Sequence, residues 1–354
     1  MGEKTLMKGN EAVAEAAIKA GCRYFFGYPI TPQNDVPAYM ARRLPEVGGT
    51  FLQAESEVAA SNMVYGAAGA GARVMTSSSS PGISLKAEGI SYIAGAELPA
   101  VIVNMMRGGP GLGGIQPSQS DYFQATKGMA HGDFRLCVLA PSSVQELVDL
   151  TMEAFEIADR YRNPVMIVGD GMIGQMMEPV EFKNEVDPDE LPKKEWATDG
   201  AKGREKNVIN SLALDPQDLE DHNWKLKEKY DKMQENEVRY ETYNMEDADM
   251  AIVAYGTTAR IAINAMEMAR KDGIKVGLIR PITLFPFPTE VIRDAADDVD
   301  SFLAVEMSTG QMIEDVRLAV EGKKPVYFHG RPGGMIPSPA EIYDKVKENI
   351  GGDR

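Results

Sequence analysis

Cysteine is nearly absent from this sequence, which excludes several classes of metal site. The two cysteines, Cys22 and Cys137, stand alone and far apart in the 354-residue chain. Cysteine-ligated iron–sulfur clusters and structural zinc sites need several ligands, usually in closely spaced cysteine pairs. The sequence therefore excludes a cysteine-ligated cluster within this chain. Both cysteines lie in apolar, strand-like stretches, so we expect buried thiols in a reducing cytoplasm.

Histidines and basic residues are also scarce. The three histidines, His131, His222 and His329, are far apart, which gives little support to a histidine metal site or a Ser-His-Asp triad. Lysine and arginine number 37 against 53 acidic residues, a formal net charge of −16. This balance argues against nucleic acid or an anionic membrane as a partner, because both need clustered basic residues.

Long apolar runs are missing as well. No uninterrupted stretch is long enough to cross a membrane, and the N-terminus lacks the apolar core of a secretion signal. With 44% hydrophobic residues the composition is ordinary for a globular protein, and the length suffices for two domains with real cores. We expect a cytoplasmic protein without membrane contact.

Short apolar strands alternate with helical patterns over residues 1–178. Strands are predicted at 23–27, 50–53, 73–77, 99–105, 136–139 and 164–168, and helices at 9–20, 34–44, 57–71, 83–94 and 143–161. Nearly continuous apolar strands that alternate with helices indicate a doubly wound parallel sheet covered on both faces. Ligands in such folds bind at the carboxyl ends of the strands, so the loops that follow the strands are where chemistry is expected.

Residues 179–246 interrupt this alternation, and residues 247–354 resume it. Asp215 before Pro216 predicts a helix start, followed by one apolar stripe of Leu219, Leu226, Tyr230, Met233 and Tyr240. Because the segment also holds both tryptophans, we expect an ordered strap rather than a loose linker. In the last part, strands are predicted at 249–255, 274–279, 301–306 and 325–328, and helices at 258–271, 310–320 and 339–349. We interpret it as a smaller α/β domain.

The loop at 27–32 reads GYPITP, which differs from a dinucleotide-binding loop. A dinucleotide site needs G-x-G-x-x-G to bring the backbone close to a pyrophosphate. Here two prolines and Tyr28 stiffen the loop around one hydroxyl, that of Thr31. This suits a hydrogen bond to a substrate, and a plain proline turn is the alternative.

Two further strand ends lead directly into helices. Glu55-Ser56-Glu57 precedes a helix rich in small residues, and the two acids are either helix N-terminal charges or place one carboxylate in a cleft. The residues alone favour the first interpretation. Residues 77–82 read SSSSPG, whose hydroxyls and helix amides suit a polar ligand or, equally, a helix cap.

The fourth strand leads into Arg107 and a glycine-rich loop, RGGPGLGG at 107–114, which lacks the Walker lysine pattern. An arginine fork at a strand end binds a carboxylate well. Gly169-Asp170-Gly171 resembles the metal-pyrophosphate motif of thiamine enzymes. The residues that follow it, however, lead out of the domain without the partner helix that the motif needs. We therefore interpret it as a turn.

Taken together, these loops resemble those of the alpha-type subunits of 2-oxoacid:ferredoxin oxidoreductases. The resemblance is carried by GYPITP at 27–32, ESE at 55–57, SSPG at 79–82, RGGPG at 107–111 and RPITLFPFP at 280–288. Each motif alone is weak, whereas the ordered set is specific and spans the chain. It implies a thiamine-enzyme pyrimidine-binding-type domain over 1–178, a strap over 179–246 and a transketolase C-terminal-like domain over 247–354.

The family resemblance also implies roles for individual residues. Thr31 and Arg107 would hold the 2-oxoacid, and Glu57 would contact the aminopyrimidine nitrogen of thiamine diphosphate, favouring the imino tautomer. Tyr28, Pro29, Ile30 and Ser80 would line the cofactor. The chain would hold no metal. Magnesium and the iron–sulfur clusters would belong to partner subunits, namely a thiamine-pyrophosphate-binding beta subunit with gamma and ferredoxin-like delta subunits.

The implied reaction is the coenzyme A-dependent oxidative decarboxylation of a 2-oxoacid, with electrons passing to ferredoxin. Residues 107–133 resemble the branched-chain, 2-oxoisovalerate members, whereas 2-oxoglutarate members more often carry an RGGPSTG-like loop. Lys127 or a partner's basic residue remains able to meet a second carboxylate, so 2-oxoglutarate and pyruvate stay open.

Two different kinds of protein would share parts of this pattern. The beta chain of a lipoamide-linked 2-oxoacid dehydrogenase has the same order of domains, but the YPITP and RGGP loops tell against it. A flavin- or nucleotide-binding electron-transfer subunit would need the G-x-G-x-x-G that is missing after the first strand. The ordered loops therefore favour the ferredoxin-linked family over both.

Overall fold

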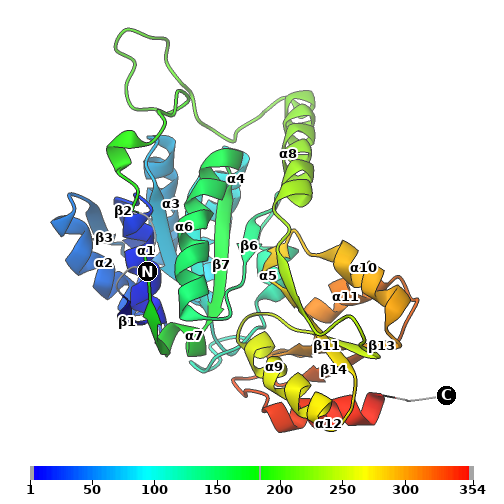
Figure 1. The fold of residues 1–354 in the computed structure, drawn as a ribbon. Helices are drawn as coiled ribbons and strands as arrows, with labels where there is room; N and C mark the ends of the chain where they lie inside the picture. Colours follow the sequence, from blue (N-terminus) through cyan, green and yellow to red (C-terminus); the bar gives the residue numbers. More distant parts are fainter. Residues whose placement is uncertain (1–3, 183–184, 351–354) are drawn as a thin grey trace.

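Two β-sheets, each covered by helices, form the body of the chain (Figure 1). The computed structural model describes residues 4–182 and 185–350. The α/β fold class expected from the sequence is confirmed. Within these described ranges, no helix is both long and apolar enough to cross a membrane.

The first sheet has seven strands in the order β12-β6-β7-β5-β4-β2-β3. Its strands are β2 (Tyr24–Gly27), β3 (Thr50–Gln53), β4 (Val74–Ser78), β5 (Ala100–Met106), β6 (Cys137–Leu139), β7 (Pro164–Asp170) and β12 (Thr283–Phe285). All are parallel except β12, which pairs antiparallel with β6 at the edge. The central strands β4, β5 and β7 are buried along their whole length, as their apolar sequences predict.

Helices cover both faces of this sheet. On one face, α1 (Gly9–Lys19) packs between α2 (Asp35–Glu46) and α6 (Val144–Tyr161). On the other face, α3 (Glu57–Gly69) packs against α4 (Pro81–Gly95). Cys22 and Cys137 are both buried, as predicted, and burial raises the pKa of each thiol to about 12.

The segment after β7 differs from the sequence interpretation. Instead of leading out of the domain, Gly171–Gln175 forms the short helix α7, and β8 (Met177–Val180) pairs antiparallel with β1 (Thr5–Lys8). Asp170 caps α7, because its side chain accepts hydrogen bonds from the N–H groups of Met172 at 2.8 Å and Ile173 at 3.2 Å. Asp170, at the end of β7, is thus a helix cap. The sequence did not show this role because the helix that it caps is very short.

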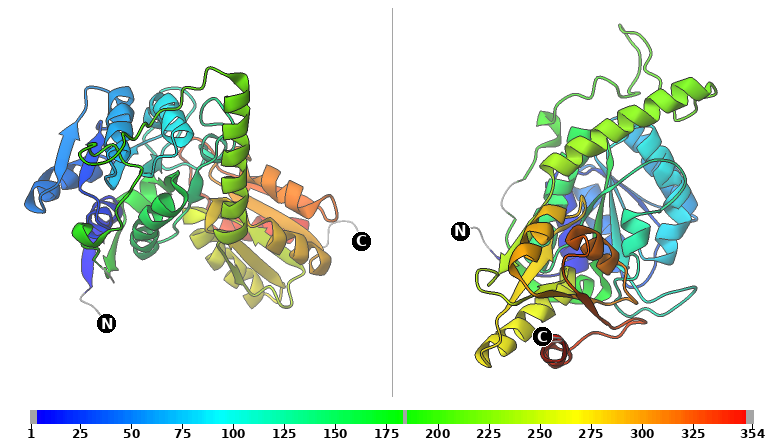
Figure 2. Two further views of the ribbon diagram at one scale, coloured as in Figure 1. Left: turned by 90° about the horizontal axis from the view of Figure 1, so that it is seen from above. Right: turned by 90° about the vertical axis from the view of Figure 1, so that its right-hand side faces the viewer.

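A long helix, α8 (Pro216–Asn236), lies along the junction of the two halves (Figure 2). It begins where Asp215-Pro216 predicts, and the Asp215 side chain accepts from the N–H of Gln217. Leu226, Tyr230 and Met233 are buried as expected, whereas Leu219 of the predicted stripe is exposed. Tyr240 is not part of this stripe, because the helix ends at Asn236 and Tyr240 begins β9 (Tyr240–Tyr243). The 3-10 turn η1 (Pro188–Glu190) precedes α8 in the strap.

The second sheet has five strands in the order β14-β13-β10-β11-β9, with β9 antiparallel. Its remaining strands are β10 (Met250–Val253), β11 (Val276–Pro281), β13 (Ser301–Glu306) and β14 (Val326–Gly330). The helices α9 (Gly256–Lys271) and α12 (Pro339–Asn349) pack together, as do α10 (Thr289–Asp298) and α11 (Met312–Val320). The predicted capping box of Ser338 and Glu341 starts α12.

The two sheets share a hydrophobic core. One buried cluster joins Ile83 and Ile102 of the first sheet's layers to Ala251 and Phe302 of the second sheet. The strand β12 also crosses over, since it lies within the RPITLFPFP motif and completes the edge of the first sheet. The second half therefore packs directly on the loops that follow the first sheet's strands.

Candidate functional site

Four of the loops singled out in the sequence meet at one edge of the first sheet. Because β2, β3, β4 and β5 are parallel, the residues that follow them lie at the same edge. These residues are the 28–34 loop, the start of α3, the start of α4, and the 107–121 loop that leads into α5 (Tyr122–Thr126). That these loops follow the strands was predicted from the sequence; that they hold the site stays a prediction.

Arg107 joins two of these loops. Its guanidinium donates to the backbone carbonyl of Thr31 at 2.9 Å and to that of Leu112 at 3.3 Å. The side chain is only 8% exposed, and its Nε has no acceptor among the described residues. Arg107 therefore fixes the position of the Thr31 loop while one of its N–H groups stays free for a ligand.

The 28–31 loop forms an exposed rim beside Arg107. Tyr28 and Pro29 are exposed, and Ile30 and Thr31 are half-buried. The Thr31 hydroxyl accepts a hydrogen bond from Asn34 at 3.2 Å, which orients it without burying it. The rim thus presents one hydroxyl and an apolar surface to whatever binds at the edge.

The structure also distinguishes between the two acids of the ESE motif. Glu55 is exposed, whereas Glu57 is 6% exposed at the start of α3, where Ser56 caps the helix by accepting from Ala59. A Cβ atom on Gly82 would lie 2.8 Å from Glu57 Oε1. The carboxyl group is therefore held against the first turn of α4 and faces the inside of the site.

Ser80 stands at the centre of a polar network. Its hydroxyl accepts from the Arg107 N–H at 2.9 Å and donates to Asp121 at 2.6 Å. The Ser80 N–H donates to Asn104, whose amide donates to Asp121 at 2.9 Å. Ser80 has φ 24°, in the left-handed region that side chains other than glycine rarely adopt, and strain of this kind gathers at functional sites.

Asn104 and Asp121 were missed by the sequence reasoning. Asn104 interrupts the apolar run of β5, AVIVNMM, and that single polar residue was the available signal. Burial raises the pKa of Asp121 above its usual value, while its hydrogen bonds from Ser80 and Asn104 act in the opposite direction. Through these hydrogen bonds, Asn104 and Asp121 join the start of α4 to β5 and to the end of the 107–121 loop.

Several buried polar atoms at this edge have no hydrogen-bond partner within residues 4–182 and 185–350. These atoms are Gln33 Nε2, Ser78 Oγ, Ser79 Oγ, Lys86 Nζ and Arg107 Nε. Buried polar groups in native proteins are normally paired, and an unpaired one costs about 1–3 kcal/mol. A cluster of them beside Glu57 and Arg107 is what a site for a polar ligand looks like before the ligand is bound.

The far end of the 107–121 loop is attached to the second half of the chain. The Gln119 side chain donates to the carbonyl of Tyr255 at 2.9 Å and accepts from the N–H of Met307 at 3.0 Å. The Gln119 N–H donates to the carbonyl of Met307 at 2.9 Å. This connection was also missed, because its partners lie more than 130 residues away in sequence.

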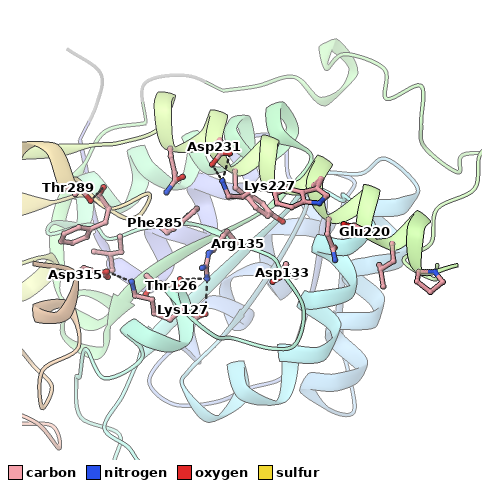
Figure 3. Close-up of a pocket in the computed structure, with 18 residues that line it drawn as sticks. Thr126, Lys127, Asp133, Arg135, Glu220, Lys227, Asp231, Phe285, Thr289 and Asp315 are labelled. Atoms are coloured by element: carbon pink, nitrogen blue, oxygen red, sulfur yellow. Dashed lines mark hydrogen bonds and ion pairs between the residues drawn. The ribbon is translucent and has the colours of Figure 1, made fainter. Parts of the chain in front are cut away.

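A larger hollow of about 960 Å³ lies under α8 and shares no residue with these loops (Figure 3). Both of its lysines are already paired, Lys127 with Asp315 and Lys227 with Asp231. Arg135 donates to backbone carbonyls and stacks over Phe285. Lys127, the candidate second contact for a dicarboxylic substrate, is paired with Asp315.

No group of three or more histidine, cysteine, aspartate or glutamate side chains suited to a metal ion occurs in the described part of the chain. His222 contacts the carbonyl of Gly95, and the His131 ring packs edge-on against Tyr92. Burial lowers the pKa of His329. The described arrangement offers hydroxyl, carboxyl and guanidinium groups at the sheet edge.

Family models match nearly the whole chain. The model described as "Pyruvate flavodoxin/ferredoxin oxidoreductase, thiamine diP-bdg" matches residues 15–247, and "Pyruvate:ferredoxin oxidoreductase core domain II" matches residues 248–342. The ketoisovalerate oxidoreductase subunit VorB of Methanothermobacter thermautotrophicus is 54% identical over 98% of both chains. The 2-oxoglutarate synthase subunit KorA of the same organism is 37% identical over 98% of this chain and 99% of its own.

Solved structures give the same picture. The 2-oxoglutarate:ferredoxin oxidoreductase from Magnetococcus marinus, with 2-oxoglutarate, coenzyme A and succinyl-CoA bound, superposes with a TM-score of 0.86 at 26% identity. The match covers 99% of this chain and 66% of that one. A split-gene transketolase has a TM-score of 0.60 at 14% identity over 100% of both chains, which supports the fold alone.

Proposed function

Since this chain belongs to the 2-oxoacid:ferredoxin oxidoreductases, as an alpha-type subunit, we propose that its sheet edge forms half of a thiamine diphosphate site. The observation that carries the proposal is that Glu57, Ser80 and Arg107 lie at one edge, among buried polar atoms that have no hydrogen-bond partner in the described chain. The proposed reaction is the coenzyme A-dependent oxidative decarboxylation of a 2-oxoacid, with electrons passing to ferredoxin.

The residues around Glu57 fit the pyrimidine end of thiamine diphosphate. The buried Glu57 carboxyl group is suited to exchange a proton with a ring nitrogen, and Gly82 leaves room beside it that a Cβ atom would fill. Tyr28, Pro29 and Ile30 supply a stiff surface for the ring. Ser80 directly precedes α4, the helix that contains Gly82. When bound, thiamine diphosphate supplies the nucleophilic carbon that attacks the 2-oxo group.

Arg107 and Thr31 fit the substrate end. The free N–H of the Arg107 guanidinium suits the carboxylate that all 2-oxoacids share. The Thr31 hydroxyl, oriented by Asn34, suits the neighbouring oxo group. Because Arg107 also holds the carbonyl of Thr31, the two groups keep a fixed separation, which favours a productive substrate orientation.

Exposed apolar side chains around the edge support a covering partner subunit. Val58 on α3 is 46% exposed, Leu85 on α4 is 54% exposed, and Leu112 on the 107–121 loop is 87% exposed. Apolar groups gathered beside a site mark a protein interface. We assign this cover to a beta subunit that binds the pyrophosphate, magnesium and iron–sulfur clusters, within a complex that includes gamma and ferredoxin-like delta subunits.

The substrate we propose is a branched-chain 2-oxoacid such as 2-oxoisovalerate. The relative that is 54% identical is named for ketoisovalerate, whereas those named for 2-oxoglutarate are 37–38% identical. Lys127 is engaged with Asp315, and burying the second carboxylate of 2-oxoglutarate without a basic partner would cost several kcal/mol. An apolar branched chain avoids that cost.

The test is a steady-state comparison on the assembled complex. We expect the co-purified subunits to reduce a viologen dye with coenzyme A fastest on 2-oxoisovalerate, ahead of pyruvate and 2-oxoglutarate. A preference for 2-oxoglutarate would overturn the substrate and leave the reaction standing. No turnover on any 2-oxoacid, in a complex that binds thiamine diphosphate, would overturn the reaction itself.

A further inference from the structure

Lys86 is a fully buried lysine on the α4 face that packs against α3. Its relative exposure is 0% in this chain alone, and Nζ has no hydrogen-bond partner in the described ranges. A buried ammonium group is costly unless it is paired, so its position requires an explanation. Its Nζ is one of the unpaired polar atoms counted for the half-site, but neither the sequence analysis nor the proposed function gives this residue a role of its own.

The spacing along α4 shows what Lys86 faces. A Cβ atom on Gly82, four residues earlier, would lie 2.8 Å from the Glu57 carboxyl oxygen. A Cβ atom on Gly89, three residues later, would overlap the hydroxyl of Ser61. Residues three and four apart lie on one helix face, so Lys86 projects between Glu57 and Ser61 of α3. The two glycines let the helices approach closely enough to enclose the amine.

Electrostatics agrees with this placement. Burial lowers the pKa of Lys86 from 10.5 to about 8, and the charge of Glu57 opposes that shift. On its own helix, Glu88 is exposed and pairs with the Tyr92 hydroxyl, on the opposite side from α3. Ser61, the other neighbour on α3, uses its hydroxyl to donate to the carbonyl of Val58 at 2.8 Å. Glu57 is therefore the acid whose charge acts on Lys86.

We propose that Lys86 is a positioning residue for the proton of Glu57: its ammonium group favours the carboxylate that remains when Glu57 passes its proton to a ligand. In that step the O–H bond of the Glu57 carboxyl breaks and a bond from hydrogen to the ligand nitrogen forms. The negative charge stays on Glu57, where the positive charge of Lys86 offsets it. The proposal rests on the cofactor contact assigned to Glu57 above.

A second lysine, which is partly buried, provides a matched control. Lys229 on α8 also has its pKa lowered to about 8 by burial, but it pairs with Glu97 at 3.6 Å and donates to the carbonyl of Arg162 at 3.3 Å. Removing a partnered charge leaves Glu97 with less compensation and destabilises the fold. Replacing Lys86 by an apolar side chain of similar length removes a charge that packing alone does not need.

The experiment uses the assembled complex with Lys86→Met, Lys86→Arg, Lys229→Met and Glu57→Gln. It measures thermal unfolding and, without substrate, the exchange of the reactive thiazolium proton of added thiamine diphosphate with deuterium. We expect Lys86→Met to unfold no earlier than wild type and to slow the exchange about tenfold or more. Lys86→Arg should recover part of that loss, and Lys229→Met should unfold earlier with normal exchange.

Each contrary outcome has a separate meaning. Normal exchange in Lys86→Met together with slow exchange in Glu57→Gln would overturn the inference and leave the Glu57 contact standing. Normal exchange in Glu57→Gln would overturn that contact itself. A Lys86→Met complex that fails to assemble, or unfolds as early as Lys229→Met, would assign Lys86 to packing and also overturn the inference.

Discussion

The guanidinium group of Arg107 donates a hydrogen bond to the backbone carbonyl of Thr31 at 2.9 Å, across 76 positions of sequence. This contact fixes the spacing between a hydroxyl and a fork of N–H donors at the sheet edge. It uses one terminal nitrogen of the arginine, a second holds Leu112, and Nε remains without an acceptor in the described chain. Arg107 thus links two loops and is also a candidate residue for binding an anion.

Arg107→Ala should raise the KM for every 2-oxoacid alike by about tenfold or more, because all share the carboxylate that the fork would bind. Arg107→Lys should recover little, since an ammonium group cannot reproduce the fork. Steady-state kinetics of the complex on three 2-oxoacids measures this. The control is Arg317→Ala on the exposed side of α11, which should change nothing. A rise in KM confined to one substrate would contradict the shared contact.

Glu57→Gln should lower kcat about 10²-fold or more, the scale of acid–base assistance, while the complex still assembles. Glutamine keeps the shape of the side chain but does not exchange a proton. Glu55→Gln is the matched control, because Glu55 belongs to the same motif yet is exposed. If turnover instead fell in Glu55→Gln and persisted in Glu57→Gln, the roles of the two acids would be reversed.

Gln119→Ala should loosen the 107–121 loop and destabilise the fold. The substitution leaves the N–H of Met307 and the carbonyl of Tyr255 buried without their partner, at a cost of about 1–3 kcal/mol each. Thermal unfolding and limited proteolysis within the loop measure the effect. Gln124→Ala is the control and should unfold close to wild type, because Gln124 donates only an exposed hydrogen bond, to Ser84. Equal unfolding of the two variants would argue against a stabilising role for the Gln119 hydrogen bonds.

The difference in stability between Lys86→Met and wild type should depend on pH. The pKa of Lys86 falls from 10.5 to about 8 on folding, so the folded chain holds this proton less tightly than the unfolded chain does. Stability of the wild type therefore increases as the pH rises from about 8 to 10.5, where the amine is neutral in the folded state and becomes neutral in the unfolded state. The difference between these two pKa values corresponds to roughly 3 kcal/mol.

The variant should accordingly exceed wild type most at pH 7 and least at pH 10, as measured by denaturant unfolding at a series of pH values. Lys232→Met is the control, because Lys232 is exposed on α8 and its replacement should leave the pH response unchanged. A stability difference between Lys86→Met and wild type that is the same at pH 7 and pH 10 would mean that Lys86 does not titrate in this range.

The sequence by itself determined the alternation of strands and helices and the placing of the motif-bearing loops directly after the strands. Both are encoded locally: β5 and β7 are runs of buried apolar residues, and Ser338 with Glu341 caps α12 within one turn. The ordered motifs also determined the family. The domain limits at 178 and 246 stay predictions.

The tertiary structure alone decided which of two neighbouring acids is buried, since Glu55 and Glu57 differ only in what packs over them. It also decided that β12 joins the first sheet, that the Gln119 side chain bonds to the second half of the chain, and that Lys86 is buried between α4 and α3. Each of these contacts joins residues that are distant in sequence, and no local periodicity encodes them. They exist because folding buries two helices or two sheets against one another, and only that packing determines which side chains meet.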